Sequence, residues 1–187
     1  MEAEIEKCTE LLLQGKVILY PTDTIWGLGC DATNEAAVKR VFQIKRRIEG
    51  KSMLVLLDKT DRLPMYVKRI PLIAWDLVGE TSRPTTFIYP QGYNIAPSVM
   101  SSDGTLAIRI VQNEFCKKLI GRLQRPIVST SANISGTPAP QLFADISKEV
   151  INEVDYVVPE KYADSCDYKP SRLIKFIDDY NFVVVRE

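Results

Sequence analysis

The sequence predicts a single α/β domain with a mixed sheet and flanking helices. Short apolar runs typical of buried strands alternate with longer segments whose apolar residues recur at helical spacing. The chain has 187 residues, 45% of them hydrophobic, which is enough for one packed core. Since no repeat, low-complexity tract or linker interrupts the sequence, we expect one domain over residues 1–187.

Helices are predicted where apolar residues recur every three to four positions and a stop or cap signal bounds the segment, such as Gly15. The predicted helical segments are residues 2–14, a helix that begins after Thr33 or Asn34 and runs into residues 45–47, residues 60–80 with breaks near Pro64 and Pro71, residues 113–123, and residues 140–152.

Strands are predicted where short apolar runs rich in Val and Ile are bounded by turn residues. They cover residues 17–20, 53–57, 85–89, 106–111, 127–130, 156–159, 171–177 and 182–185. The stretch 21–32 follows the first strand and contains two threonines, two aspartates and two glycines. We expect this stretch to be a loop.

Composition argues against several classes of function. Lys and Arg total 24, as do Asp and Glu, so the chain has no global positive field to hold long nucleic acid. There is no apolar run of about 18 residues that would predict a membrane span, and the acidic N-terminus is unlike a signal peptide. The widely spaced cysteines favour reduced thiols in a cytoplasmic protein; they are Cys8, Cys30, Cys116 and Cys166.

The chain contains no histidine. This excludes every mechanism that uses a Ser-His or Cys-His pair, and it removes the commonest zinc ligand. Any chemistry must therefore use carboxylates, Lys, Arg, hydroxyls, a hard metal ion or groups of the substrates themselves.

The segment KRR at 45–47 allows two interpretations. If the helix ends near Lys45, an extended chain places Lys45 and Arg47 on one side, where the two cations suit a polyphosphate. Alternatively they form a solvated helix terminus, which these residues considered alone favour.

Polar residues gather at the end of the predicted strand 127–130. They are Ser129, Thr130, Ser131 and Asn133. Ligands of open α/β sheets bind beyond the carboxyl ends of strands, and hydroxyl, amide and loop N–H groups suit phosphate or carboxylate oxygens. A polar connecting loop explains the same composition about equally well.

Arg109 interrupts an apolar strand, and buried arginines are rare unless they are paired. It either faces solvent or holds an anion in a cleft. Thr22 and Thr24 share one side of an extended chain. Asp23 would repel phosphate and suits an ammonium group, a metal ion or a loop N–H. The GxxxxGK[ST] and GxGxxG nucleotide motifs are both absent.

Five motifs, taken in order, resemble the YrdC-like family of threonylcarbamoyl-adenylate synthases. They are YPTDTIWGLGCDA at 20–32, IKRR at 44–47, LAIRIV at 106–111, STSANISG at 129–136 and KPSRLIKF at 169–176. The similarity covers a core of about 10–178. The resemblance implies a twisted mixed sheet with a concave basic cavity.

The resemblance also implies a reaction. L-threonine, bicarbonate and ATP, with Mg²⁺ held mainly by the ATP phosphates, give threonylcarbamoyl-AMP and pyrophosphate. In this family the product supplies the t6A modification of adenosine 37 in tRNA. The implied partners therefore include tRNA or double-stranded RNA and the proteins that complete the transfer.

Site residues follow from the same resemblance, motif by motif. The family motifs K-x-R and S-x-N are associated with the ATP phosphates, and they match Lys45, Arg47, Ser131 and Asn133. The family's P-T-x-T motif, strand arginine and late serine form the threonine pocket, and they match Thr22, Thr24, Arg109 and Ser171. Weaker matches are Thr86, Ser129, Asp23 and Arg172. No residue is assigned as a nucleophile, acid or base, since positioning and charge neutralisation can supply most of the catalysis.

Three features depart from the family pattern. Ile48 follows K-x-R where proline is common, Arg172 stands where threonine is usual, and the sequence ends at residue 187, as in short family members. We therefore expect a different loop path after Arg47. A lid over the cleft is expected to be absent or formed by the tail after Ser165.

Two other functions stay open on the sequence alone. One is a non-catalytic module that binds structured RNA, which the balanced charge disfavours. The other is carbamoyl-adenylate chemistry with a different acceptor, as in hydrogenase-maturation proteins that contain a YrdC-like domain.

Overall fold

The computed structural model describes residues 1–48, 52–79, 81–163 and 169–187. Ser165 and Cys166, and with them the start of the tail considered as a lid, lie outside these residues. The strands are β1 (Ile18–Tyr20), β2 (Gly27–Gly29), β3 (Leu54–Leu57), β4 (Thr85–Tyr89), β5 (Leu106–Ile110), β6 (Ile127–Ser131), β7 (Tyr156–Val157), β8 (Arg172–Phe176) and β9 (Phe182–Arg186).

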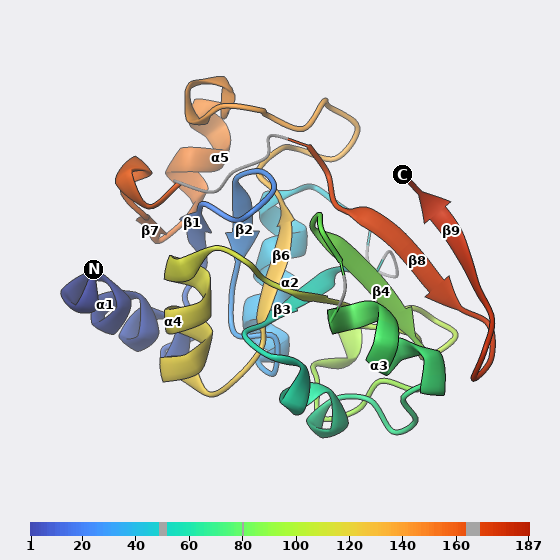
Figure 1. Ribbon diagram of the computed structural model, residues 1–187. Helices are drawn as coiled ribbons and strands as arrows, with labels where there is room; N and C mark the ends of the chain where they lie inside the picture. The colour runs from blue at the N-terminus through green and yellow to red at the C-terminus, as the bar shows by residue number, and fades with distance from the viewer. Residues whose placement is uncertain (49–51, 80, 164–168) are drawn as a thin grey trace.

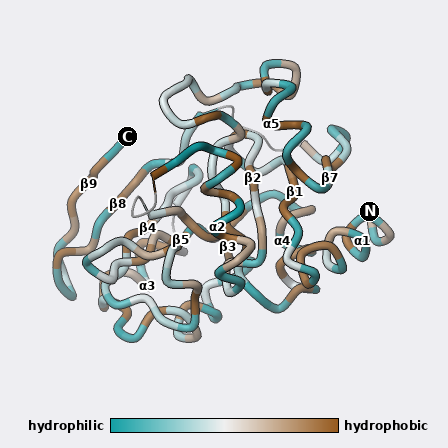
Figure 2. The backbone as a smooth tube through the Cα atoms, turned by 180° about the vertical axis from the view of Figure 1, so that it is seen from behind, coloured by the Kyte–Doolittle hydropathy of each residue, from teal (hydrophilic) through white to brown (hydrophobic). Residues whose placement is uncertain are grey.

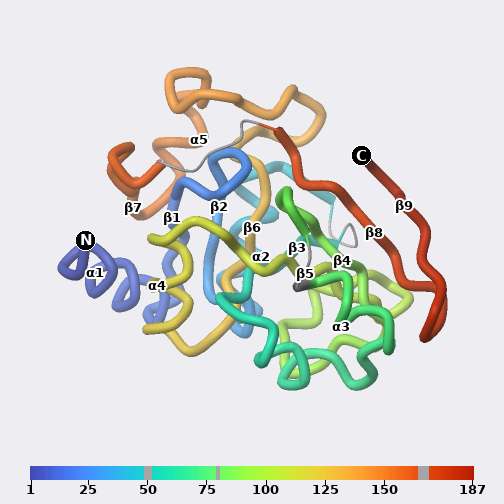
Figure 3. Tube along the Cα trace, viewed as in Figure 1, coloured from blue at the N-terminus to red at the C-terminus, as the bar shows by residue number. Residues whose placement is uncertain are grey.

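These strands form one mixed sheet in the order β7-β1-β2-β6-β3-β5-β4-β8-β9 (Figure 1). The late strand β6 lies between the early strands β2 and β3, so segments far apart in the sequence meet at the centre of the sheet (Figure 3). The largely apolar strand β9 lies at one edge (Figure 2). All five of its residues are exposed. The predicted α/β fold with a mixed sheet and flanking helices is confirmed.

The helices are α1 (Glu2–Leu13), α2 (Glu35–Ile44), α3 (Leu72–Gly79), α4 (Glu114–Leu123) and α5 (Lys148–Glu153), with 3₁₀ turns at Thr60–Met65, Pro97–Val99, Phe143–Asp145 and Glu160–Tyr162. Side-chain oxygens of Asn34 and Asn113 cap α2 and α4. Within the described part of the chain, no helix is both long and apolar enough to cross a membrane.

The helix predicted over 140–152 is too long. Residues 143–145 form a 3₁₀ turn, and α5 begins only after Ser147, whose hydroxyl accepts the Val150 N–H. The serine cap explains the late start, because serine favours the N-cap position over a helix interior.

Alternation along the strands divides the core into two clusters, one on each face of the sheet. Leu19 belongs to the cluster that α2 covers, whereas Ile18 and Tyr20 belong to the cluster that contains Leu12 of α1 and Leu119 of α4. Among the described residues, cysteines 8, 30 and 116 are buried and form no disulfide with one another.

Strand β2 corrects the prediction that residues 21–32 form only a loop. Gly29 pairs with Ile18 of β1, and a Cβ atom at Gly29 would collide with the Tyr20 ring and approach the Val128 carbonyl oxygen to 2.7 Å. The Tyr20 hydroxyl donates to that same carbonyl at 3.0 Å, so its ring crosses over Gly29. The glycine therefore allows close packing within a strand, although in the sequence it resembles loop composition.

The strand register positions the predicted site. Arg109 pairs with Thr86 on one side and with Leu56 on the other, so these three side chains point to the same face. Leu56 packs in the cluster under α1 and α4, whereas Arg109 and Thr86 line a cleft. The two helices thus cover one part of this face, and the cleft occupies the neighbouring part.

Replacing Gly29 by Ala is expected to destabilise the fold by about 1–3 kcal/mol, because the added methyl group meets a ring and a backbone oxygen. Gly121→Ala in α4 is the matched control, since its Cβ would lie 3.6 Å from Asp58 Oδ2, an ordinary contact, and alanine favours the helix. Urea unfolding measures both variants. Equal stability of the two proteins would contradict the assigned packing role of Gly29.

Candidate active site

The cleft has a volume of about 410 Å³ and is rich in hydroxyl and guanidinium groups. Its polar lining residues are Thr24, Arg47, Ser52, Thr86, Arg109, Ser129, Thr130, Ser131, Ser171 and Arg186. Apolar residues, among them Leu54, Ile88 and Ala107, fill the spaces between them. No carboxylate occurs among the described residues that line the cleft, so the cleft suits anions.

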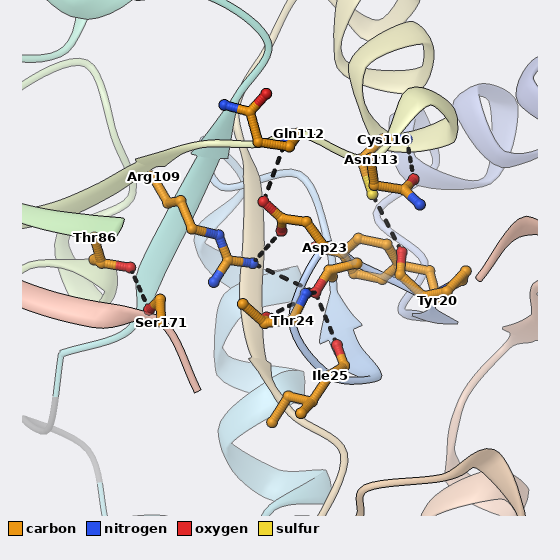
Figure 4. Close-up of polar contacts among 12 residues, drawn as sticks. Tyr20, Asp23, Thr24, Ile25, Thr86, Arg109, Gln112, Asn113, Cys116 and Ser171 are labelled. Atoms are coloured by element: carbon orange, nitrogen blue, oxygen red, sulfur yellow. Dashed lines mark hydrogen bonds and ion pairs between the residues drawn. The ribbon is translucent and has the colours of Figure 1, made fainter. Parts of the chain in front are cut away.

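Arg109 forms a buried ion pair with Asp23 (Figure 4). Its Nη2 lies 3.0 Å from Asp23 Oδ1, and the two side chains are only 3% and 2% exposed. The second carboxylate oxygen of Asp23 accepts the Gln112 N–H at 3.0 Å. Arg109 lines the cleft and Asp23 does not. Asp23 therefore acts as a brace, holding the guanidinium in place from the side that faces away from the cleft.

Thr22 connects this ion pair to Thr24. The two threonine hydroxyls lie 2.9 Å apart, and Thr22 Oγ1 also donates to the Ile25 carbonyl at 2.8 Å. Arg109 Nη2 approaches Thr22 Oγ1 to 3.4 Å. Thr22 is fully buried, whereas Thr24 lines the cleft. The segment after β1 therefore presents one hydroxyl to the cleft and uses the other internally.

Strands β4 and β8 contribute a second pair of hydroxyls. Thr86 Oγ1 lies 2.7 Å from Ser171 Oγ, and both residues are buried and line the cleft. In Figure 4 the Arg109 guanidinium lies between this pair and Asp23. A carboxylate bound at Arg109 would thus lie close to hydroxyls that can donate or accept.

The turn after α2 sends its three cations in different directions. Arg46 adopts φ 48°, its N–H donates to the Gln43 carbonyl, and the Arg47 N–H donates to the Phe42 carbonyl. This is the hydrogen-bond pattern of a Schellman C-cap with Arg46 in the left-handed position. Because the chain reverses at Arg46, Lys45 and Arg47 do not share one side as an extended chain would require.

The three side chains of this turn reach different partners. Arg47 lines the cleft and donates to the Ser52 carbonyl at 2.8 Å. Arg46 is exposed and pairs with Glu149. Lys45 is 2% exposed and is not among the residues that line the cleft. Its ammonium instead bonds to residues 131 and 133.

The loop after β6 divides its two predicted residues between two hollows. Ser131 lines the cleft and donates to Asn133 Oδ1 at 2.5 Å. Asn133 lines a neighbouring hollow of about 650 Å³, and its amide donates to the Thr137 carbonyl at 2.6 Å. Asn133 therefore shapes the loop, while Ser131 presents a hydroxyl to the cleft.

Burial and mutual repulsion lower the pKa values of two arginines that line the cleft. Burial lowers the pKa of Arg47. Burial, with a smaller effect of nearby Arg109, lowers the pKa of Arg186. The Nε atoms of Arg47 and Arg109 are buried and have no hydrogen-bond partner in the described part of the chain. Since buried unpaired donors are unfavourable, acceptor oxygens of a bound ligand would stabilise this arrangement.

The described residues do not form a metal site of their own. No group of three or more Cys, Asp or Glu side chains is placed to hold a metal ion among them, and the described lining of the cleft contains no carboxylate.

Most of the predicted site residues converge on the cleft. The lining includes Thr24, Arg47, Thr86, Arg109, Ser129, Ser131 and Ser171. The predicted residues outside the lining are Thr22, Asp23, Lys45, Asn133 and Arg172. Arg172 points elsewhere and donates to Glu187 at 3.0 Å.

Arg186 is a cleft residue that the sequence analysis missed. Its Nε and Nη2 donate to the Ser171 carbonyl at 3.1 and 2.7 Å, which ties β9 to the start of β8 beside the cleft. The signal was available in the sequence, because Arg186 ends the apolar run 182–185 much as Arg109 interrupts its own strand.

Comparison with known proteins identifies the class. A family profile described as "Telomere recombination", the Sua5/YciO/YrdC family, matches residues 10–187. The chain belongs to this family. A threonylcarbamoyl-AMP synthase of Hahella chejuensis is 33% identical over 171 residues, which are 90% of this chain and 91% of that protein.

Solved structures show the same architecture. Pyrococcus abyssi Sua5 complexed with L-threonine superposes with a TM-score of 0.85 at 27% identity, over 100% of this chain and 54% of that one. This chain thus spans about half the length of Sua5. Escherichia coli YciO superposes with a TM-score of 0.82 at 23% identity, over 100% of this chain and 90% of the YciO chain. At this identity the likeness establishes a shared fold and nothing about activity.

Asp23→Asn is expected to lower the free energy of unfolding by about 3 kcal/mol, because it leaves the buried Arg109 charge without its partner. Glu6→Gln is the matched control, since it removes the same charge from a half-exposed pair with Arg122 and should change stability by less than about 0.5 kcal/mol. Chemical unfolding at pH 7 compares them. Similar small losses in both variants would rule out the brace.

Proposed function

We propose that the protein is an L-threonylcarbamoyl-AMP synthase that uses L-threonine, bicarbonate and Mg-ATP. The observation that carries the proposal is the braced, buried Arg109, whose Nε has no partner among the described residues, in a cleft with two further arginines and several hydroxyls. Such a cleft suits a carboxylate beside a polyphosphate. The names of the relatives at about one-third identity and the threonine bound by Sua5 point the same way.

The threonine end of the site is assigned to the floor of the cleft. Arg109 receives the amino-acid carboxylate in a charge-assisted pair. The Thr86–Ser171 pair and the Thr24 hydroxyl lie around the same space and can bond to the amino and hydroxyl groups. Ala107 and Ile88 provide an apolar wall for the methyl group.

The ATP end is assigned to the opposite wall. Arg47 and the Ser131 hydroxyl contact the phosphate oxygens, and Arg186 adds a third cation to the cleft. Mg²⁺ enters with ATP and is held mainly by its phosphates, which agrees with the lack of carboxylates in the described lining.

The chemistry then needs no protein nucleophile. The threonine nitrogen attacks the carbon of bicarbonate-derived CO₂, loses a proton to solvent and becomes a carbamate. A carbamate oxygen attacks the α-phosphorus of ATP, the bond from that phosphorus to the β-phosphate oxygen breaks, and pyrophosphate leaves. The protein holds the reactants together and places Arg47 near the charge that develops on the leaving group. This explains how a chain without histidine can catalyse the reaction.

The downstream role belongs to the same proposal. Threonylcarbamoyl-AMP is a mixed anhydride, so its carbonyl carbon is activated for attack by an amine. A further transferase would direct the acyl group to adenosine 37 of tRNA. A cytoplasmic location is consistent with that role.

Mass spectrometry tests the proposal directly. Protein incubated with L-threonine, bicarbonate and Mg-ATP is expected to form threonylcarbamoyl-AMP and release pyrophosphate. Serine, glycine and carbamoyl phosphate serve as alternative substrates in parallel reactions. Folded protein that forms no such product, or that releases pyrophosphate equally well with carbamoyl phosphate and without threonine, would contradict the proposal.

A further inference from the structure

We propose that Lys45 is a positioning residue that holds the loop 131–135 in place, and that it is not itself a ligand of the ATP phosphates. The proposal deepens the proposed function, since it rests on the assignment of Ser131 and Arg47 to the phosphate end of the cleft.

The Lys45 ammonium is already fully used within the protein. It donates to the Ser131 carbonyl, to the Asn133 carbonyl at 2.7 Å and to Asn133 Oδ1 at 3.2 Å. An ammonium has three donors, so these contacts use all of them. The Lys45 carbonyl in turn accepts the Ser135 N–H at 2.8 Å. One residue thus joins the end of α2 to the loop at four points.

The backbone explains why Lys45 and Arg47 separate. The left-handed Arg46 reverses the chain, so Arg47 extends to the cleft while Lys45 extends beneath the loop. Lys45 is 2% exposed. Burial, with a smaller contribution from nearby Arg47, lowers the pKa of its ammonium to about 8. The amine therefore remains mostly protonated at neutral pH, as three acceptors require.

Contact with a phosphate would require Lys45 to abandon these acceptors. The Ser131 and Asn133 carbonyls would lose a charged donor, and Asn133 Oδ1 would keep only the Ser131 hydroxyl. Losing charge-assisted bonds at partly buried groups is unfavourable. The consequence for function is indirect. Lys45 fixes the Ser131 and Asn133 carbonyls and so holds Ser131 Oγ at the cleft. Because a hydroxyl has a single donor, Ser131 must turn its O–H from Asn133 Oδ1 to donate to a phosphate oxygen.

Hydrogen exchange in the ligand-free protein tests this role. In Lys45→Met, the backbone amides of residues 133–137 are expected to exchange at least tenfold faster than in the wild type. Arg47→Met and Arg46→Met remove a cation from the same turn without touching the loop bonds of Lys45, so they should exchange as the wild type does. Wild-type exchange in Lys45→Met would overturn the proposal. No substrate is present, so this outcome is independent of whether the protein is a synthase.

Binding of inorganic triphosphate provides a readout that a purely structural role would not change. Lys45→Met and Ser131→Ala should each weaken triphosphate binding about tenfold. The double variant should bind triphosphate as tightly as whichever single variant has the lower affinity, with no further loss. L-threonine affinity should stay within twofold of the wild type. Multiplicative losses in the double variant would identify Lys45 as a direct phosphate ligand and overturn the proposal.

Thermal unfolding establishes that each variant is folded. If Lys45→Met does not fold, Lys45→Arg replaces it in both measurements. A planar guanidinium cannot direct donors at three acceptors around one nitrogen, so the loop should again exchange faster. A Lys45→Arg variant with wild-type exchange and wild-type triphosphate affinity would fit a phosphate ligand and overturn the proposal.

Discussion

The buried ion pair between Asp23 and Arg109 is the interaction on which the rest of the site depends. Asp23 follows β1, whereas Arg109 lies on β5, four positions away in the sheet order, so the segment after β1 must reach across the sheet face. Two charges are stable in such a place only when they are closely paired and hydrogen-bonded, and the Gln112 N–H supplies the additional bond. The pair therefore fixes both the path of this segment and the guanidinium.

The other features of the cleft follow from that arrangement. The segment held by Asp23 presents Thr24 to the cleft. Thr86 pairs with Arg109 across strands β4 and β5, and its hydroxyl lies beside that of Ser171. Asp23 fixes the guanidinium on one side, and Arg109 also lines the cleft. Arg186, whose pKa is lowered by burial and by Arg109, adds to a concentration of positive charge that an anion would relieve.

The sequence predicted the strands of this site better than its turns. Apolar runs defined β4 and β5 closely, and the motif resemblance selected Arg109, Ser131 and Ser171. Two local backbone features could not be predicted. Gly29 reads as a loop residue until Tyr20 is known to cross it. A left-handed arginine is uncommon, so nothing in KRR indicates that Lys45 and Arg47 diverge.

Amino-acid binding tests most directly the claim that Arg109 is a braced carboxylate anchor. Calorimetry would compare L-threonine with L-threoninamide, which lacks the negative charge, in the wild type, Arg109→Lys and the control Arg172→Lys, whose site lies outside the cleft lining. We expect the wild type and the control to prefer threonine by about tenfold or more, as a charge-assisted bidentate pair requires, and Arg109→Lys to lose most of this preference. A folded Arg109→Lys variant with the full wild-type preference would contradict the claim.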